Sequence, residues 1–210
     1  MNKLAAERLC LLAGSILILA AVCLYVYARL EDIRAGEEAA SAVEMLRQSQ
    51  SAASASATVE EEQPVESTVP EAESEAPETS EATETRVDRE YLGVLTIPAL
   101  GLELPVQTEW SMANLKVSPC RQCGSVAGGD LVIAAHNYKS HFGRLNSLSK
   151  GDEVRFTSQD GAEAVYTVER LAQLSPKNPE AVRDGGCPLV LYTCTPGGKA
   201  RVAVYCRRQS

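Results

Sequence analysis

Histidine is scarce in this sequence, and net positive charge is absent. The 210 residues include only two histidines, and the formal net charge is −8 at pH 7. Residues 29–90 carry five basic and 17 acidic side chains, whereas residues 91–210 carry 13 basic and 10 acidic ones. A surplus of three positive charges over residues 91–210 is too small to form a basic face, and no motif that reads a DNA groove is visible. The sequence therefore argues against nucleic-acid binding.

Charge is absent altogether from Leu9 to Ala28, a run of twenty residues. A helix of that length rises about 1.5 Å per residue and spans roughly 30 Å, the thickness of the hydrocarbon core of a bilayer. The run continues through Tyr25 and Tyr27, past the length of a cleaved signal peptide. We therefore expect residues 1–28 to form a cytoplasmic tip and a single-pass membrane anchor, with the rest of the chain extracellular.

Aromatic residues are missing from residues 49–88, which consist mainly of Ser, Ala, Thr, Glu and Pro. Such a composition cannot bury enough apolar surface to offset the entropy of ordering the chain. Residues 31–48 have apolar side chains at helical spacing. Residues 29–90 are therefore predicted to form a short juxtamembrane helix with little to bury, followed by a disordered acidic stalk.

Residues 91–210 have the pattern of a mainly β domain. Candidate strands cover 92–97, 131–135, 153–157, 164–170, 188–193 and 201–207, separated by Gly, Pro, Asp and Asn turns. Segments 153–158 and 164–170 alternate apolar and polar residues, whereas 131–135 and 188–193 are apolar runs typical of strands buried on both faces. This density of short strands predicts a closed barrel or a sandwich.

Two side chains at the ends of those apolar runs suggest chemistry. Cys194 ends one run and His136 ends the other, whereas His141 lies five residues further along in a polar loop. A cysteine nucleophile needs a partner that holds it as thiolate and protonates a leaving amine, and histidine suits both tasks near neutral pH. The competing interpretation is a packed cysteine and two ordinary loop histidines.

Arg201 favours the chemical interpretation. It follows Cys194 across the tight turn TPGGKA, so two antiparallel strands can bring a guanidinium beside the thiol. A fixed positive charge there can stabilise an oxyanion or orient a substrate carbonyl.

The other cysteines allow different chemistry. Cys120 and Cys123 form a C-x-x-C pair, and with Cys187 and Cys206 they could build a zinc site or two disulfides. The second pair is not C-x-x-C, and no histidine has ligand spacing to it, which weighs against zinc. Cys187 and Cys206 could meet across the last hairpin, and cysteines that stay reduced are an equally good interpretation.

Three segments together resemble the sortase family. VLYTCTPGGKAR resembles the signature in which a strand ending Leu-x-Thr-Cys delivers the nucleophile and an arginine follows on the next strand. IAAHNYKSHFGRLNSLSKGDEV resembles the family's histidine segment, and LTIPALGLELPV resembles its first strands. The resemblance covers essentially residues 91–210 and implies a sortase catalytic domain with an eight-stranded closed β-barrel and short helices.

The resemblance also implies a mechanism. Cys194 would attack a carbonyl in a carboxy-terminal sorting signal of Leu-Pro-x-Thr-Gly type on a secreted protein, His136 would act as general acid and base, and Arg201 would bind substrate and stabilise the oxyanion. An amine of a peptidoglycan precursor or a pilin lysine would then resolve the thioester. No cofactor and no metal is expected. A different envelope cysteine transpeptidase or peptidase acting on wall peptides is the alternative, and an inactive binding barrel is a third.

The subclass of the resemblance stays open, with class B and class D as candidates. The loop from Ala172 to Gly186, which helps to select substrate in the family, matches no particular subclass. The sorting motif and the acceptor amine also stay open.

Overall fold

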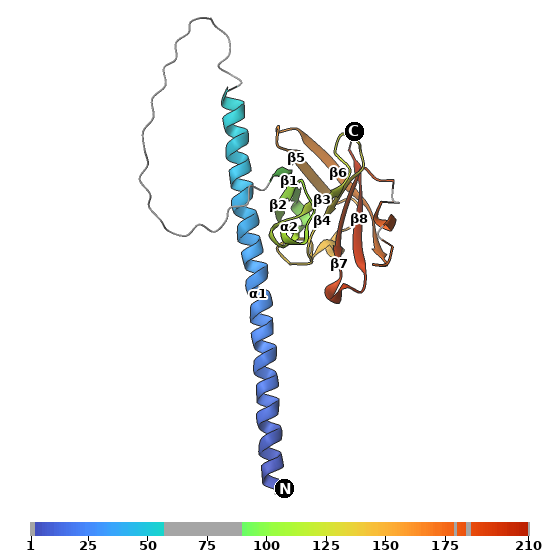
Figure 1. Cartoon of the computed structure of the whole chain (residues 1–210). Helices are drawn as coiled ribbons and strands as arrows, with labels where there is room; N and C mark the ends of the chain where they lie inside the picture. Colours follow the sequence, from blue (N-terminus) through green and yellow to red (C-terminus); the bar gives the residue numbers. More distant parts are fainter. Residues whose placement is uncertain (1–2, 57–89, 179, 184–185, 210) are drawn as a thin grey trace, which may run out of the picture.

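The computed structural model describes residues 3–56, 90–178, 180–183 and 186–209. Its first element is one continuous helix, α1 (Lys3–Ser56). Figure 1 shows α1 as a long rod that runs past a small β domain. The segment Leu12–Ser49 contains a window with a mean hydropathy of 1.9, long and apolar enough to cross a membrane. The apolar side chains of residues 12–30 are exposed, with Leu17 and Leu24 each 70% exposed.

The helix differs from the prediction in its extent. No break separates the apolar run from the juxtamembrane segment, and residues 49–56, predicted as the start of the stalk, continue the helix. Ser, Ala and Gln fill these positions, and Ala in particular has a high helix propensity. The remainder of the predicted stalk, residues 57–89, lies outside the described residues.

Within the described residues, eight strands close into a barrel in the order β1-β2-β3-β4-β7-β8-β6-β5. Their bounds are β1 (Tyr91–Ile97), β2 (Leu102–Gln107), β3 (Cys120–Cys123), β4 (Leu131–Ala134), β5 (Glu153–Ser158), β6 (Glu163–Leu174), β7 (Leu189–Cys194) and β8 (Arg201–Arg208). The short helices are α2 (Met112–Val117) and the 3-10 turns η1 (Pro98–Leu100), η2 (Leu145–Ser147), η3 (Glu180–Val182) and η4 (Pro196–Gly198). The closed barrel confirms the predicted fold class, and each of the six candidate strands exists.

Two barrel strands, β2 and β3, are not among the six strands that the residue pattern predicts. β2 contains Pro105, and proline is disfavoured inside strands. β3 is only four residues long and has a polar centre. Pro105 is nevertheless paired with Val94 in the antiparallel β1–β2 ladder.

The central strands β4 and β7 are parallel neighbours, with Leu131 opposite Leu189 and Ala134 opposite Tyr192. Every residue of β4 is buried, as the apolar run predicted. β5 and β6 alternate buried and more exposed positions, also as predicted. The core is filled by aliphatic and aromatic side chains, the largest of which, Tyr166, Phe142 and Phe156, are at most 1% exposed.

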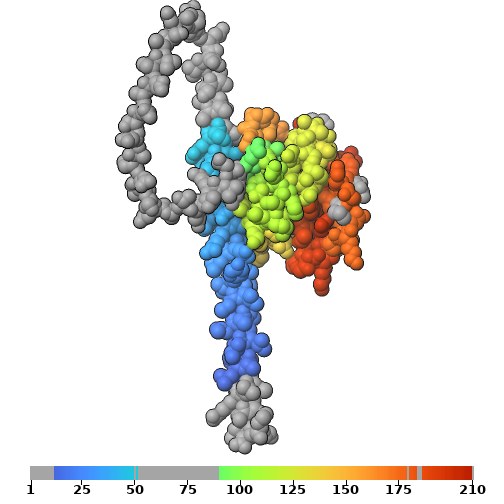
Figure 2. Space-filling model, in the orientation of Figure 1, coloured from blue at the N-terminus to red at the C-terminus, as the bar shows by residue number. Residues whose placement is uncertain are grey.

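Helix α1 packs along the outside of the barrel through residues with small or aliphatic side chains. These buried residues are Ala35, Ala39, Ala42, Val43 and Leu46. Val43 and Leu46 form a cluster with Val94 of β1, and Arg47 forms an ion pair with Glu103 of β2. In Figure 2 the middle of α1 lies directly against the barrel surface. The expectation that the juxtamembrane helix would have little to bury is therefore wrong, because small side chains allow close packing without a broad apolar stripe.

Candidate active site

The β7–β8 hairpin brings Cys194 and Arg201 together. Cys194 ends β7, Arg201 begins β8, and the two residues are a paired position of the antiparallel ladder. Thr195 closes the turn, since its backbone N–H donates to the Ala200 carbonyl at 2.8 Å and its Oγ1 accepts from the Ala200 N–H at 3.0 Å. Cys194 is exposed, and Arg201 is partly buried.

His136 follows the neighbouring parallel strand. The pairing of β4 with β7 continues beyond Ala134, because the Ala135 N–H donates to the Tyr192 carbonyl at 3.2 Å. The buried Thr193 hydroxyl donates to the Ala135 carbonyl at 2.8 Å. Continuing this parallel register by two residues from the Ala134–Tyr192 pair sets His136 level with Cys194. All three sequence-predicted site residues therefore lie at one end of the barrel.

The ring of His136 is half-buried and lies 5.0 Å from the ring of Tyr138, measured between centroids. Burial lowers the pKa of His136 below its usual value, Lys116 lowers the pKa further, and Glu31 opposes both effects. The Nε2 atom of His136 is buried and makes no hydrogen bond to the described residues. An imidazole kept mostly neutral, with a ring nitrogen free, can accept a proton from a neighbouring thiol.

His141 differs from its sequence interpretation. It was expected in a polar loop, but its side chain is completely buried. Burial lowers the pKa of His141 to about 4, against the opposing effect of the Ala35 and Val117 carbonyls nearby. Burial makes His136 the better candidate of the two, because a fully buried ring has no access to substrate.

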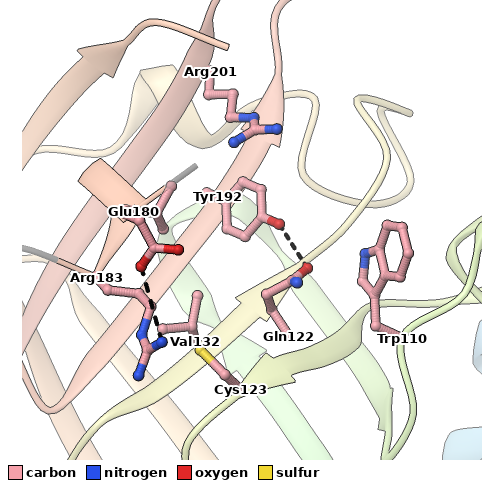
Figure 3. Close-up of a pocket in the computed structure, with 9 residues that line it drawn as sticks. Trp110, Gln122, Cys123, Val132, Glu180, Arg183, Tyr192 and Arg201 are labelled. Carbon is pink, nitrogen blue, oxygen red and sulfur yellow. Dashed lines mark hydrogen bonds and ion pairs between the residues drawn. The ribbon is translucent and has the colours of Figure 1, made fainter. Parts of the chain in front are cut away.

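A groove of about 420 Å³ opens beside the β7–β8 hairpin. It is lined by Trp110, Gln122, Cys123, Val132, Glu180, Val182, Arg183, Tyr192 and Arg201. Figure 3 shows Arg201 at one side of the Tyr192 ring, with Gln122 and Trp110 on the other. The Tyr192 hydroxyl donates to Gln122 Oε1 at 2.8 Å, and the Arg201 guanidinium carbon lies 5.7 Å from the centroid of the Tyr192 ring.

Arg201 connects the groove to Cys194. Its side chain lines the groove, while its backbone pairs with Cys194 across the hairpin. The Nε atom of Arg201 is buried and has no hydrogen-bond acceptor among the described residues. A buried N–H without a partner is unusual, so this donor is suited to an oxygen that a ligand brings into the groove.

The four remaining barrel cysteines are less exposed than Cys194. Cys120 packs with Leu115 and Ala134, Cys187 packs beneath η3, and Cys206 faces the barrel interior. Cys123 lines the groove. All are free thiols, and over the described residues no three His, Cys, Asp or Glu side chains gather as a metal site.

Several residues of this region were missed by the sequence interpretation. Lys116 on α2 and Glu31 on α1 act electrostatically on His136, and Tyr192 and Gln122 shape the groove. Lys116 and Glu31 are 20 and 105 residues distant from His136 along the chain. No local pattern connects such residues, because only the closed barrel brings α1, α2 and the end of β4 together.

The structural class of this protein is a closed β-barrel. It presents one exposed thiol, Cys194, at a strand end, beside a groove that Arg201 lines. The sortase-domain family model matches residues 95–209 of the chain, more than half of its length. The chain therefore belongs to the sortase family.

Known relatives agree with that membership. Over 122 residues the chain is 27% identical to sortase A of Bacillus anthracis, a match covering 55% of this chain and 58% of the relative. The structure resembles sortase A from Corynebacterium diphtheriae, with a TM-score of 0.53, 22% identity and coverage of 60% of this chain and 63% of that one. It also resembles sortase C from Clostridium perfringens, with a TM-score of 0.51, 21% identity and coverage of 58% and 71%. These structural likenesses concern the fold.

Proposed function

We propose that this chain is a membrane-anchored cysteine transpeptidase that transfers a peptide acyl group from a sorting signal to an amine. The observation that carries the proposal is the pairing of an exposed Cys194 with Arg201, which lines a groove, with His136 at the end of the adjacent parallel strand. Membership of the sortase family supports the same reaction class.

In the first half-reaction His136 accepts the proton of the Cys194 thiol, and the sulfur attacks the carbonyl carbon of the scissile peptide bond. The carbonyl oxygen becomes an oxyanion, and Arg201 donates a hydrogen bond to it through a guanidinium nitrogen. His136 gives a proton to the departing amine as the C–N bond breaks, which leaves a thioester on Cys194. The released fragment is the carboxy-terminal part of the sorting signal.

In the second half-reaction an acceptor amine attacks the thioester carbonyl. His136 removes a proton from the incoming nitrogen, the C–S bond breaks, and the Cys194 thiol is restored. The substrate class is a secreted protein with a Leu-Pro-x-Thr-Gly-like signal, and the acceptor is an amine of a peptidoglycan precursor or a pilin lysine. A thioester suits this exchange because it persists in water long enough for an amine to compete with hydrolysis.

Helix α1 supports a position at the membrane. The uncharged residues 9–28 would span the bilayer, and the unbroken helix leads directly into the segment that packs on the barrel. The barrel would then lie on the extracellular side, close to the membrane surface, where both a secreted protein and a lipid-linked wall precursor are found.

The test is a product analysis with the full chain in detergent micelles. The protein is incubated with a library of sorting-signal peptides, with and without a small amine, and separately with wall stem peptides. Ligation of the amino-terminal peptide fragment to the amine is the expected result. Cleavage or crosslinking of stem peptides, with every sorting peptide left intact, would replace the proposal by a wall-peptide enzyme.

A further inference from the structure

Helix α1 is fastened to the loop that carries His136 by one cluster of hydrogen bonds. The Ser140 backbone N–H donates to Asp32 Oδ1 at 3.0 Å. The Ser140 hydroxyl lies 2.7 Å from the same carboxylate oxygen and 2.9 Å from the Asp32 backbone carbonyl. The side chain of Asp32 is only 13% exposed, so these bonds are sheltered from water. Burial acts to raise the pKa of Asp32, but the bonds from Ser140 and the charge of Arg29 lower it overall, so Asp32 is ionised at neutral pH.

The loop from His136 to Gly143 transmits the position of Ser140 to His136 because it is internally bonded. The Tyr138 carbonyl accepts from the His141 N–H at 3.0 Å and from the Gly143 N–H at 2.8 Å. The His136 carbonyl accepts from the Phe142 N–H at 3.2 Å. The Tyr138 ring lies between the rings of His136 and His141, at centroid distances of 5.0 and 5.5 Å.

Close approach of α1 to this loop depends on Gly36. A Cβ built on Gly36 would lie 3.1 Å from the Cβ of Ser140, which is tighter than ordinary packing. One turn before Gly36, Asp32 makes the hydrogen bonds to the same serine. The small side chains of Ala35 and Ala39, both buried, extend this contact along α1.

The contact also brings a charge to the site. Glu31, adjacent to Asp32 on α1, raises the pKa of His136 and so opposes Lys116. A helix that served only as a tether would not need this contact with the loop of residues 136–143.

From these contacts we infer that α1 is part of the active site and that Asp32 is a positioning residue, which holds the His136 loop in place through Ser140. This inference rests on the proposed transpeptidase function. It implies that the anchor helix sets the catalytic efficiency of the barrel as well as its location, since a small displacement of His136 separates it from the thiol.

The experiment compares Asp32→Ala, Asp32→Asn and Gly36→Val with wild type in the full chain in detergent micelles. Two readouts are taken, kcat and KM for acyl transfer from a sorting peptide, and amide hydrogen exchange over residues 136–143. We expect Asp32→Ala to lower kcat between about ten- and a hundredfold with little change in KM, because misplacing a catalytic group costs this much. Hydrogen exchange in the loop should accelerate in the same variant.

The other variants separate positioning from simple loss of charge. Asp32→Asn keeps a carbonyl oxygen that can accept from Ser140, so it should recover most of kcat. Gly36→Val keeps Asp32 but pushes α1 away from Ser140, so it should reproduce the Asp32→Ala result. Glu37→Gln, which removes an exposed acidic charge on the same helix, is the control and should behave as wild type.

The outcomes also distinguish this inference from the proposed function. If wild type transfers no acyl group to any peptide, the proposed function fails, and faster exchange of residues 136–143 in Asp32→Ala and Gly36→Val would still establish the contact. If wild type is active but Asp32→Ala and Gly36→Val leave both kcat and loop exchange unchanged, the inference is overturned.

Discussion

At the scale of single residues, the proposed site consists of three side chains that lie at the ends of strands. The placement of Cys194, Arg201 and His136 at strand ends could be predicted from the sequence, because each stands beside an apolar run or a tight turn, where a strand must end. Glu31, Asp32 and Lys116 could not be predicted, because their proximity to His136 arises only when α1 and α2 pack on the closed barrel.

Arg201 is expected to act as a geometrically specific donor. Arg201→Ala should lower kcat/KM for acyl transfer by about a hundred- to a thousandfold, the usual effect of removing an oxyanion donor. Arg201→Lys keeps the charge but loses the planar fork of donors, so it should recover only part of that loss. Steady-state kinetics on both variants are the measurement, with Arg208→Ala, exposed at the other end of β8, as the control. Full activity in Arg201→Ala would contradict the assignment.

The pKa of His136 should respond to its charged neighbours in opposite directions. Lys116→Gln removes a positive charge that disfavours the imidazolium, so the pKa should rise, whereas Glu31→Gln should lower it. Imidazole proton NMR can follow this titration, since the chain has only two histidines and His141 titrates near pH 4. Lys150→Gln, at an exposed turn, should leave the titration unchanged. Shifts of the same sign in both variants would show that solvent access, and not these two charges, controls the pKa of His136.

At the scale of elements, the β7–β8 hairpin was predicted correctly, with its antiparallel pairing and the turn near Gly197. The residue pattern alone missed β2 and β3, because a proline interrupts one and the other is short and polar, although the family resemblance placed the segment of β2 among the first strands. The docking of α1 was missed for another physical reason. Ala35, Ala39 and Ala42 bury little area each, so they leave a weak apolar pattern although they permit close packing.

The hairpin turn sets the register of Cys194 and Arg201 through left-handed glycines. Gly197 has φ 77° and Gly198 has φ 69°, and a Cβ at either position would meet no atom within 4 Å. The cost of Gly197→Ala is therefore a backbone cost, about 1–2 kcal/mol for a left-handed conformation. Thermal unfolding followed by near-ultraviolet circular dichroism should show a lower midpoint for Gly197→Ala than for Gly197→Asn, since asparagine tolerates this conformation better. Equal midpoints for the two variants would contradict this account of the turn.

At the scale of the whole molecule, the sequence pattern separated an apolar helix, an acidic linker region and a β domain, and resemblance to a family supplied the number of strands. What it could not supply was the contact between the juxtamembrane part of α1 and the β domain. That contact buries His141, which lies near the Ala35 carbonyl of α1 and the Val117 carbonyl of α2.

Buried His141 should make the fold sensitive to mild acid. Its folded pKa of about 4 lies below the ordinary value of 6.5, so the unfolded chain binds a proton first as the pH falls. Stability should therefore decrease from about pH 6.5 down to pH 4, by up to roughly 3 kcal/mol from this group. The pKa of Asp32 is lowered from 3.8, so its protonation should reduce stability only below about pH 4.

Thermal midpoints between pH 7 and pH 4 test that prediction in wild type and His141→Asn. The variant is expected to be less stable at pH 7 but to show a flatter dependence on pH, since it has no group that must stay neutral. An unchanged slope in His141→Asn would assign the acid sensitivity to other groups, including His136, whose pKa is also lowered.

The most direct test of the central claim is the mass of the enzyme caught with its acyl group. The full chain is mixed with a cleavable sorting peptide and the reaction is quenched in acid. The intact mass is measured, and the modified residue is located by proteolysis and peptide mapping. Cys194→Ala and the groove variant Cys123→Ala are treated in parallel. The account predicts an adduct equal to the amino-terminal peptide fragment, on Cys194 alone, absent from Cys194→Ala, retained in Cys123→Ala and discharged by an amine. Amine ligation that persists in Cys194→Ala, or an adduct that maps to another residue, would contradict it.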